Sequence, residues 1–249
     1  MRLVWVAVAV FGSVFACSAH ASDPNALWKI VNGECVPHQQ EFGSPLPCIS
    51  VNGSAGYAIL KDIVGKTQLL LIPTAKVRGI EDPEILAPNA PDYWEYAWEA
   101  IRDVEALAGK PLPREDLSLA INSPYARTQN QLHIHIDCIR ADVADALQTH
   151  ADQIGDTWTP FAPRIGRTPY RVMRVPTLQQ PGANPFQLLA RAEPDMNHET
   201  LAVVGATLPG GLPGFYMLET RADPAIPFSG GAEELQDHEC KVAHLPMQN

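Results

Sequence analysis

The stretch Gln131-Leu-His-Ile-His-Ile-Asp-Cys-Ile139 decides how the rest of the chain is interpreted. Its polar and apolar residues alternate and its isoleucines are β-branched, which is typical of a strand. Because successive side chains of a strand point to opposite faces, His133, His135 and Asp137 share one face and the apolar residues share the other. The sequence therefore predicts a strand over 132–139 whose polar face carries two imidazoles and a carboxylate within about 14 Å.

Composition sets broad limits on the fold and the partners. A chain of 249 residues that is 46% apolar can form one large domain or two small ones with a substantial core. Its 23 prolines predict short elements and long connections. The net charge of −10 disfavours a general nucleic-acid-binding protein, because a phosphate backbone requires a basic surface. A small anionic ligand needs only a local cluster of cations and is not excluded.

The N-terminus has the pattern of an export signal. Arg2 precedes an apolar run and an Ala-x-Ala sequence that ends at Ala21, so residues 1–21 are predicted to be a signal peptide that is cleaved after Ala21. An uncleaved membrane anchor is the alternative, although the run is short beside the ~20 residues that a membrane span usually needs. Lipidation of Cys17 is disfavoured by the bulky Phe15 before it.

The cysteines fit an exported protein, in which disulfides can form. One of the five cysteines lies in the signal, and the remaining four allow three pairings. The local pairing of Cys35 with Cys48 closes a short loop and leaves Cys138 for Cys240. Since the spacing matches no zinc-ligand pattern, two disulfides are predicted. The second would tie the C-terminal end to the back of the histidine strand.

The rest of the chain predicts helices and strands in mixed order. Helices are expected over 23–36, 91–110, 141–154, 185–192 and 233–240. Further strands are expected over 57–62, 67–72, 117–121, 170–175, 201–207 and 215–221, with 67–72 apolar throughout and therefore central in the sheet. This mixture, with its hairpins, indicates an α+β fold with an antiparallel sheet.

The polar face of the histidine strand allows three interpretations. In the first, His133 and His135 are structural, and the protein is an exported module that binds a nucleotide or a lipid. In the second, His133, His135 and Asp137 are the ligands of a metal-dependent phosphoester hydrolase. In the third, one imidazole is a nucleophile that attacks phosphorus and forms a covalent intermediate. The residues alone leave the metal and the nucleophile open, although clustered titratable groups favour function.

A resemblance favours the nucleophile. The stretch from Gln131 to Asp137 resembles the His-φ-His-φ-His-φ-φ motif of the histidine-triad (HIT) superfamily, with Gln131 in the first position. Upstream, Asn122 and Thr128 match the family's Asn and Ser/Thr pattern. More closely, these segments and the late Gln236-Asp-His-Glu-Cys240 are similar to the bacterial CDP-diacylglycerol pyrophosphatase family. That similarity runs from about residue 28 to residue 240.

The resemblance implies a fold and a reaction. The fold would be a HIT-like antiparallel sheet with packed helices, in one domain over 22–249 with a core of about 55–155 and a C-terminal α+β extension over 156–249. The reaction would be hydrolysis of the diphosphate of CDP-diacylglycerol to CMP and phosphatidate, through a nucleotidyl-histidine on His133. The other ring nitrogen of His133 would donate to the backbone carbonyl of Gln131.

The same resemblance implies roles for the neighbouring residues. His135 and Gln131 would contact phosphoryl oxygens or the leaving group. Asn122, Arg127 and Thr128 would bind phosphate oxygens, and the fork of donors on arginine suits that role. No metal or cofactor is required. Asp137 becomes a bystander on this view, and three other histidines are expected to be surface or local structural groups: His198, His238 and His244.

The expected partner is CDP-diacylglycerol, a lipid nucleotide, and the expected location is the periplasmic side of the bacterial inner membrane. The protein would be anchored there by its first segment, or free in the periplasm if the signal is cleaved. No nucleic-acid partner is expected, and the oligomeric state is left open. Tyr170, Phe186 and Phe215 are expected to be core residues rather than the walls of an acyl groove.

Overall fold

The computed structural model describes residues 23–179, 182–227 and 229–244. The predicted signal or anchor over residues 1–21 lies outside the described residues. In the described part of the chain, no helix combines the length and the apolar character that crossing a membrane requires.

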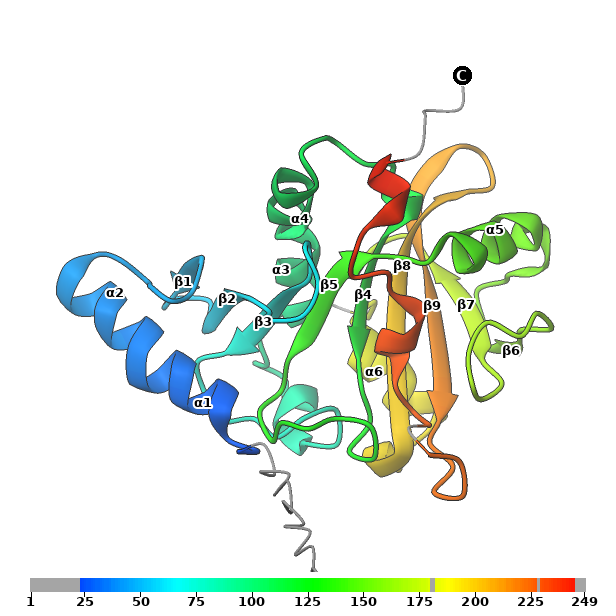
Figure 1. The fold of residues 1–249 in the computed structure, drawn as a ribbon. Helices are drawn as coiled ribbons and strands as arrows, with labels where there is room; N and C mark the ends of the chain where they lie inside the picture. Colours follow the sequence, from blue (N-terminus) through cyan, green and yellow to red (C-terminus); the bar gives the residue numbers. More distant parts are fainter. Residues whose placement is uncertain (1–22, 180–181, 228, 245–249) are drawn as a thin grey trace, which may run out of the picture.

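One antiparallel sheet of nine strands organises the described residues (Figure 1). The strands are β1 (Ser50–Asn52), β2 (Tyr57–Lys61), β3 (Leu69–Pro73), β4 (Leu117–Ile121), β5 (Ile134–Cys138), β6 (Thr159–Pro160), β7 (Arg171–Val175), β8 (Glu199–Leu208) and β9 (Leu212–Arg221). Their order is β1-β2-β3-β5-β4-β8-β9-β7-β6. The α+β class and the antiparallel sheet are therefore confirmed. So is the internal position of β3, which lies between β2 and β5.

Helices lie on both faces of this sheet. The α-helices are α1 (Ala26–Ile30), α2 (Val36–Phe42), α3 (Tyr93–Glu99), α4 (Ile101–Ala108), α5 (Ala141–Thr149) and α6 (Pro185–Ala192). The π-helical and 3-10 segments are η1 (Val31–Cys35), η2 (Pro83–Leu86), η3 (Arg114–Asp116), η4 (Ala151–Gln153), η5 (Met196–His198), η6 (Ala232–Leu235) and η7 (Lys241–His244). Helices α3, α4 and α6 pack on one face of the sheet in the largest apolar cluster. That cluster includes the fully buried Ile134 and Ile136, so the apolar side of the histidine strand is a core face, as predicted.

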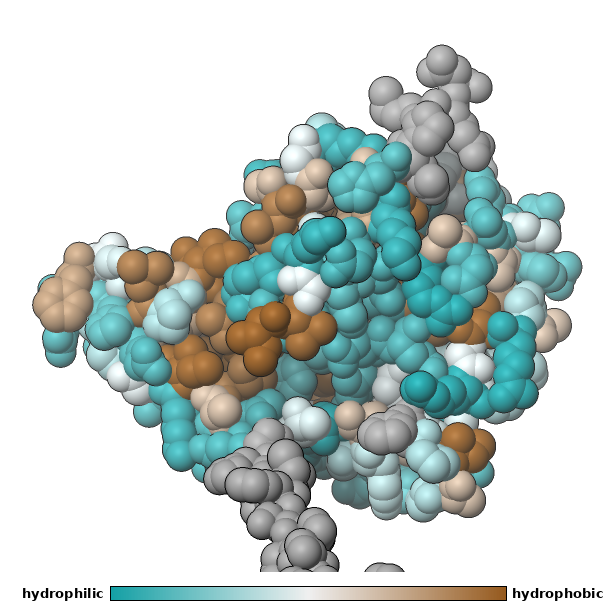
Figure 2. Space-filling view, viewed as in Figure 1, coloured by the Kyte–Doolittle hydropathy of each residue, from teal (hydrophilic) through white to brown (hydrophobic). Residues whose placement is uncertain are grey.

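The opposite face carries two separate covers. Segments α1, η1 and α2, which we call the N-terminal cover, pack on β2 and β3. Helix α5 and η6 pack on β4, β7, β8 and β9. Strand β5 runs between these covers (Figure 1). Its polar face is on their side of the sheet, because His135 pairs with Leu70 and Ala120, which belong to the two covered clusters. On the same side of the molecule, apolar residues gather over the N-terminal cover, whereas the other half is mainly hydrophilic (Figure 2).

The N-terminal helix is longer than predicted. It continues from Ala26 through the π-helical η1 to Phe42, past the Asn32-Gly33 that the sequence suggested as its end. Pro37 comes directly after the π-helical η1, where the regular α-helical hydrogen-bond pattern is already interrupted, and the helix continues past it. The helix ends at Gly43, whose φ of 66° is the left-handed conformation that glycine adopts readily.

The predicted helix over 233–240 is wrong. Residues 232–244 instead form an irregular segment, the C-terminal strap, which contains η6 and η7. Its backbone pairs with the end of β5: Gln236 forms a bridge with Ile139, and the N–H of Asp237 donates to the carbonyl of Cys138 at 2.9 Å. Backbone groups used in this way are not available for helical hydrogen bonds. The long helix predicted over 91–110 is also divided, at Ala100, into α3 and α4.

Both predicted disulfides are confirmed. Cys35 is bonded to Cys48 beneath the N-terminal cover, and Cys138 is bonded to Cys240 of the strap. Tyr170, Phe186 and Phe215 are all buried, which confirms them as core residues.

Candidate active site

His133 lies immediately before β5, and its side chain is almost fully buried, with 7% of its surface exposed. Its Nδ1 is 2.7 Å from the backbone oxygen of Gln131. Because a carbonyl oxygen only accepts hydrogen bonds, Nδ1 carries the proton and Nε2 presents its lone pair. Burial lowers the pKa of His133 and outweighs the opposing effect of the hydrogen bond to Gln131, so the ring is neutral at pH 7. His133 is thus held in a single tautomer with a free lone pair, which is what a nucleophilic imidazole requires.

His135 is held in the complementary tautomer. Its Nδ1 is 2.6 Å from Nε2 of Gln68, and the same amide nitrogen donates to Oε1 of Glu233 at 3.0 Å. Since the amide donates, Nδ1 of His135 accepts, and the ring proton is on Nε2. Burial lowers the pKa of His135 to about 4, so this ring is also neutral. The centroids of the two imidazoles are 4.9 Å apart, which places one lone pair and one N–H donor side by side.

The Nε2 donor of His135 has no hydrogen-bond partner among the described residues. Oε2 of Glu233 lies 3.6 Å from this nitrogen, which is too far for a hydrogen bond. A buried donor without a partner costs free energy unless a ligand satisfies it. The arrangement therefore favours an incoming oxygen acceptor at this position.

Glu233 comes from the C-terminal strap and lies beside both imidazoles. Asn122 holds it twice: the amide nitrogen of Asn122 donates to Oε2 at 3.0 Å, and the amide oxygen accepts from the backbone N–H of Glu233 at 3.1 Å. Partial burial works against the carboxylate, but its contacts with His238, His135, Gln68 and Asn122 hold the pKa of Glu233 well below its usual range. Glu233 is therefore a fixed anion at the site.

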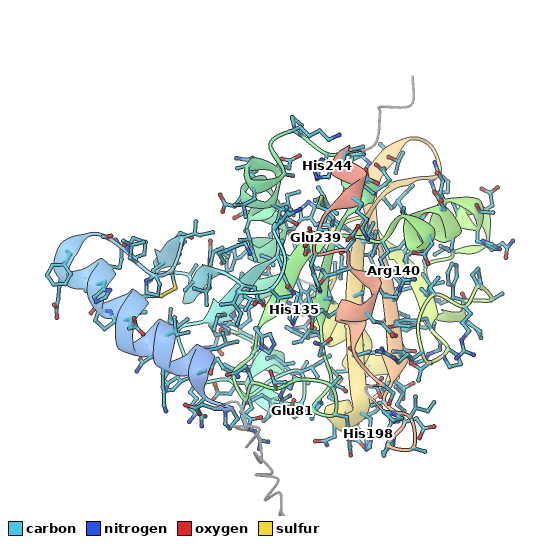
Figure 3. All side chains as sticks on the ribbon, viewed as in Figure 1. Glu81, His135, Arg140, His198, Glu239 and His244 are labelled. Carbon is cyan, nitrogen blue, oxygen red and sulfur yellow. A yellow bond between two sulfur atoms is a disulfide. The ribbon has the colours of Figure 1, made fainter. Side chains whose placement is uncertain are left out.

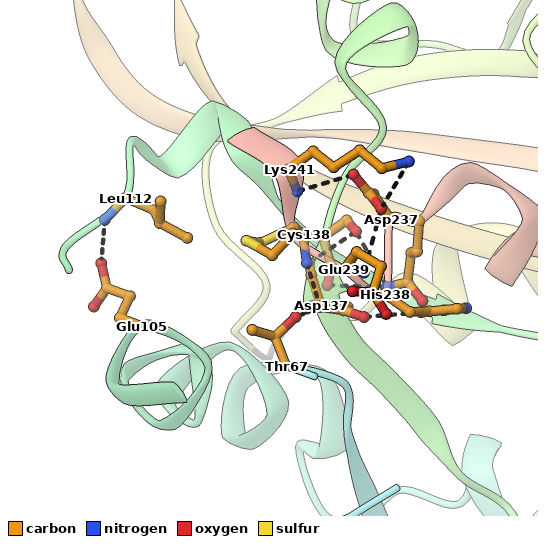
Figure 4. Close-up of a disulfide and its surroundings, with 12 residues drawn as sticks. Thr67, Glu105, Leu112, Asp137, Cys138, Asp237, His238, Glu239 and Lys241 are labelled. Atoms are coloured by element: carbon orange, nitrogen blue, oxygen red, sulfur yellow. Dashed lines mark hydrogen bonds and ion pairs between the residues drawn. A yellow bond between two sulfur atoms is a disulfide. The ribbon is translucent and has the colours of Figure 1, made fainter. Parts of the chain in front are cut away.

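His238 joins Glu233 to Asp137, and its contact with Asp137 is drawn in Figure 4. Its Nδ1 lies 2.8 Å from Oδ2 of Asp137, and its Nε2 lies 3.4 Å from Oε1 of Glu233. Burial opposes a charge on this ring, but the two carboxylates outweigh that effect and raise the pKa of His238 to about 9. Asp137 is fully buried and also accepts from the hydroxyl of Thr67 at 2.6 Å. Together Asp137 and His238 fix the strap against β5, so His238 has a structural role that joins segments 101 residues apart. That Asp137 is a bystander in catalysis stays a prediction.

We expect this pair to make stability depend on pH in the alkaline range. The pKa of His238 rises from its ordinary 6.5 to about 9, so the charged ring contributes stability that is complete below pH 6.5 and is lost as the pH rises through about 9. The shift corresponds to roughly 3 kcal/mol. Urea unfolding at pH 6 and pH 10 should show that His238→Gln lowers the free energy of unfolding at pH 6 and much less at pH 10. An equal loss at both pH values would contradict the charged pair.

The structure brings some of the predicted site residues together and holds others apart. His133, His135 and Asn122 converge with Glu233 around the polar face of β5. His135 lies near the centre of the molecule (Figure 3). The side chain of Gln131 is fully buried and donates to the carbonyls of Pro73 and Ala75, at 3.0 and 2.8 Å. In this position it fastens the histidine stretch to the end of β3.

Arg127 does not present a free guanidinium to the site. It forms a bidentate pair with Glu81, with nitrogen–oxygen distances of 2.5 and 2.6 Å, and only 7% of its side chain is exposed. Thr128 is exposed on the same loop. Their roles in binding phosphate remain predictions, because each requires a rearrangement or a ligand that reaches the loop.

Three residues of the site were not predicted from the sequence: Gln68, Glu233 and His238. Gln68 lies just before β3, and Leu70 of that strand pairs with His135, so strand pairing could have suggested this contact. His238 belongs to the late Gln-Asp-His-Glu-Cys segment, which carried a resemblance but no assigned role. Glu233 carried no local signal, because it is 165 residues from its partner Gln68.

The described residues contain no group of three or more His, Cys, Asp or Glu side chains placed to hold a metal ion. The carboxylate of Asp137 faces Thr67, His238 and the backbone N–H of Cys138. It therefore does not converge with the two imidazoles as the metal interpretation requires.

The fold and the site define a class of protein: an α+β protein with two neutral imidazoles and a carboxylate gathered at the polar face of an internal strand. The comparisons with known proteins give the family. Residues 22–244 match the model of the CDP-diacylglycerol pyrophosphatase family, and the chain belongs to that family. It is 42% identical over 234 residues to a CDP-diacylglycerol pyrophosphatase of Yersinia pestis, with 91% of this chain and 88% of the relative covered. The chain is thus a hydrolase that acts on phosphoric anhydrides.

Proposed function

We propose that this protein hydrolyses the diphosphate of CDP-diacylglycerol to CMP and phosphatidate, with His133 as the nucleophile. The substrate is supported by the family and by the similarity to the Yersinia pestis enzyme. The observation that carries the mechanism is the hydrogen bond from Nδ1 of His133 to the Gln131 carbonyl, because it directs the lone pair of Nε2 outward.

In the first step, Nε2 of His133 attacks the phosphorus of the cytidylyl group. A P–N bond forms, the P–O bond to the bridging oxygen breaks, and the electron pair of that bond leaves with phosphatidate. The ring of the intermediate carries positive charge, which the Gln131 carbonyl stabilises through Nδ1–H. The Nε2–H of His135 donates to a phosphoryl oxygen and so satisfies the unpartnered donor.

In the second step, water attacks the same phosphorus and the P–N bond breaks. Its electron pair returns to Nε2 of His133, CMP is released, and the proton of the water passes to solvent. Gln68, Glu233 and Asn122 act by positioning, because their hydrogen bonds hold His135 in the tautomer that can donate. No metal takes part in this scheme, since positioning and charge stabilisation suffice for phosphoryl transfer.

The proposal extends to the fold family and the location of the protein. The HIT-like assignment is supported by β4 and β5, which pair in antiparallel fashion, and by the position of His133 at the start of β5. On this view residues 55–155 are the HIT-like core, and residues 156–249 extend the same sheet through β7, β8 and β9. The substrate is a lipid, so we place the protein at the periplasmic side of the inner membrane, where disulfides form.

The test uses CDP-diacylglycerol labelled at the cytidylyl phosphorus, with and without EDTA. We expect CMP and phosphatidate as products in both conditions, and acid-labile label on His133 after rapid quenching. Activity that is lost in EDTA would support the metal-dependent alternative. Binding of the substrate without hydrolysis would support the non-enzymatic binding module. Label recovered on His135 would show that the second imidazole is the nucleophile.

A further inference from the structure

The loop between β2 and β3 exposes two adjacent apolar side chains. Ile63 is 99% exposed and Val64 is 51% exposed, although both belong to residue types that are usually buried. A single exposed apolar residue is ordinary on a protein surface. Two adjacent exposed apolar residues at the tip of a loop form a small apolar protrusion. We call Ile63 and Val64 the apolar tip.

The apolar tip is held by defined contacts. The N–H of Val64 donates to Oδ1 of Asp62 at 3.0 Å, and the ammonium of Lys61 donates to the carbonyls of Asp62 and Gly65 at 2.7 and 3.0 Å. Gly65 adopts a positive φ of 66°, which favours glycine at this turn. These contacts satisfy backbone groups within the loop. Fewer hydrogen bonds to water are therefore lost when the tip enters an apolar medium, and the free-energy cost of entry is lower.

The apolar tip is close to the candidate active site along the chain and in space. Lys66 donates its backbone N–H to the carbonyl of His238 at 2.8 Å. The loop and the strap pack so closely here that a Cβ added to Gly65 would overlap His238. Two residues further on, Gln68 bonds His135. The contact at the tip is therefore only a few residues from the groups that hold His135 in place.

The tip also lies on an apolar side of the molecule. In the view toward the polar face of β5, apolar residues gather over the N-terminal cover and toward the centre, and the half over α5 is mainly hydrophilic (Figure 2). Three more exposed apolar side chains belong to the N-terminal cover and the turn that follows it: Phe42, Leu46 and Ile49. An apolar surface beside a site for a lipid substrate is more stable in contact with a bilayer than in contact with water.

We propose that the apolar tip inserts into the surface of a lipid bilayer and docks the active site over its substrate. This inference rests on the proposed function, because CDP-diacylglycerol keeps its acyl chains in the bilayer and its diphosphate at headgroup level. An imidazole must therefore reach the headgroups from outside. The tip supplies the apolar contact at the end of β3 where Gln68 holds His135, and the bilayer, rather than a second copy of the chain, is its partner.

The first test uses the full chain and vesicles that contain lipids with brominated acyl chains, which quench tryptophan on contact. Ile63→Trp adds a fluorophore at the tip. Leu212→Trp is the matched control, because Leu212 is 67% exposed at the start of β9, far along the sheet from β2 and β3. We expect quenching above that of the unaltered chain for Ile63→Trp only. Equal quenching of the two variants would overturn the docking role. Absence of quenching in Ile63→Trp because the chain self-associates through the tip would overturn it as well.

The second test compares two substrates: CDP-diacylglycerol in vesicles, and an analogue with acyl chains short enough to stay in solution. We expect Ile63→Ser with Val64→Ser to lower kcat/KM on vesicles by about ten-fold or more, since two apolar side chains lose their burial in lipid. The same variant should keep kcat/KM on the soluble analogue. An equal loss on both substrates would place the loop in the catalytic machinery and overturn docking. If the unaltered chain hydrolyses neither substrate, the proposed function fails, while the quenching test still decides docking.

Discussion

His133→Ala should lower kcat on CDP-diacylglycerol by roughly 10⁴- to 10⁶-fold, as loss of a covalent nucleophile does in other hydrolases. The reason is the fixed tautomer: the Gln131 carbonyl holds the proton on Nδ1, so Nε2 of His133 is the one lone pair that the two neutral imidazoles offer. The measurement is a product assay for CMP, together with the label retained on the quenched protein. Both signals should disappear together.

Two further variants make this result specific. Gln131→Ala should only slow turnover per folded molecule, because its contribution to the nucleophile is a backbone carbonyl that survives the substitution. His150→Ala is the matched control: its Nδ1 bonds the carbonyl of Ala146 at 2.9 Å, in the same manner as His133, but at the end of α5. Equal losses from Gln131→Ala and His133→Ala would mean that the register is mistaken and that His135 is the central residue.

Local sequence pattern predicted much of the scaffold, and the reason is visible in the strands. The bounds of β4 match the prediction, and β2 and β5 match it within two residues at each end, because alternation and flanking turns specify them locally. The same argument placed His133 and His135 on one face. Helix α6 was also found, with Asn184 capping it through the N–H groups of Phe186 and Gln187.

The rest of the site depends on contacts between residues far apart in the chain. Glu233 meets Gln68 across 165 residues, and His238 meets Asp137 across 101. Glu81 takes Arg127 away from the expected phosphate site across 46. None of these pairings produces a periodic pattern in the sequence. Local pattern therefore predicted a helix for the strap, whereas its backbone pairs with the end of β5.

The Cys138–Cys240 bond has the largest expected effect on stability. Cys138 points to the face of β5 that packs on α3 and α4, whereas Asp137 and its partner His238 lie on the other face. The strap therefore crosses the end of β5, and the disulfide fixes that crossing two residues after His238. With the cysteines 102 positions apart, the bond should contribute about 4.7 kcal/mol, against about 3 kcal/mol for the 13-position separation of Cys35 and Cys48.

We therefore expect Cys138→Ala with Cys240→Ala to lower the free energy of unfolding more than Cys35→Ala with Cys48→Ala does, as measured by urea unfolding. The two pairs should also separate by activity. Loss of the strap crossing loosens His238 and Glu233, so kcat/KM on the soluble analogue should fall by about ten-fold per folded molecule. Loss of Cys35–Cys48 should leave that value nearly unchanged, because this bond lies beneath the N-terminal cover. Equal kcat/KM for the two double variants would show that hydrogen bonds alone position the strap, with Gln236 and Arg140 as its anchors.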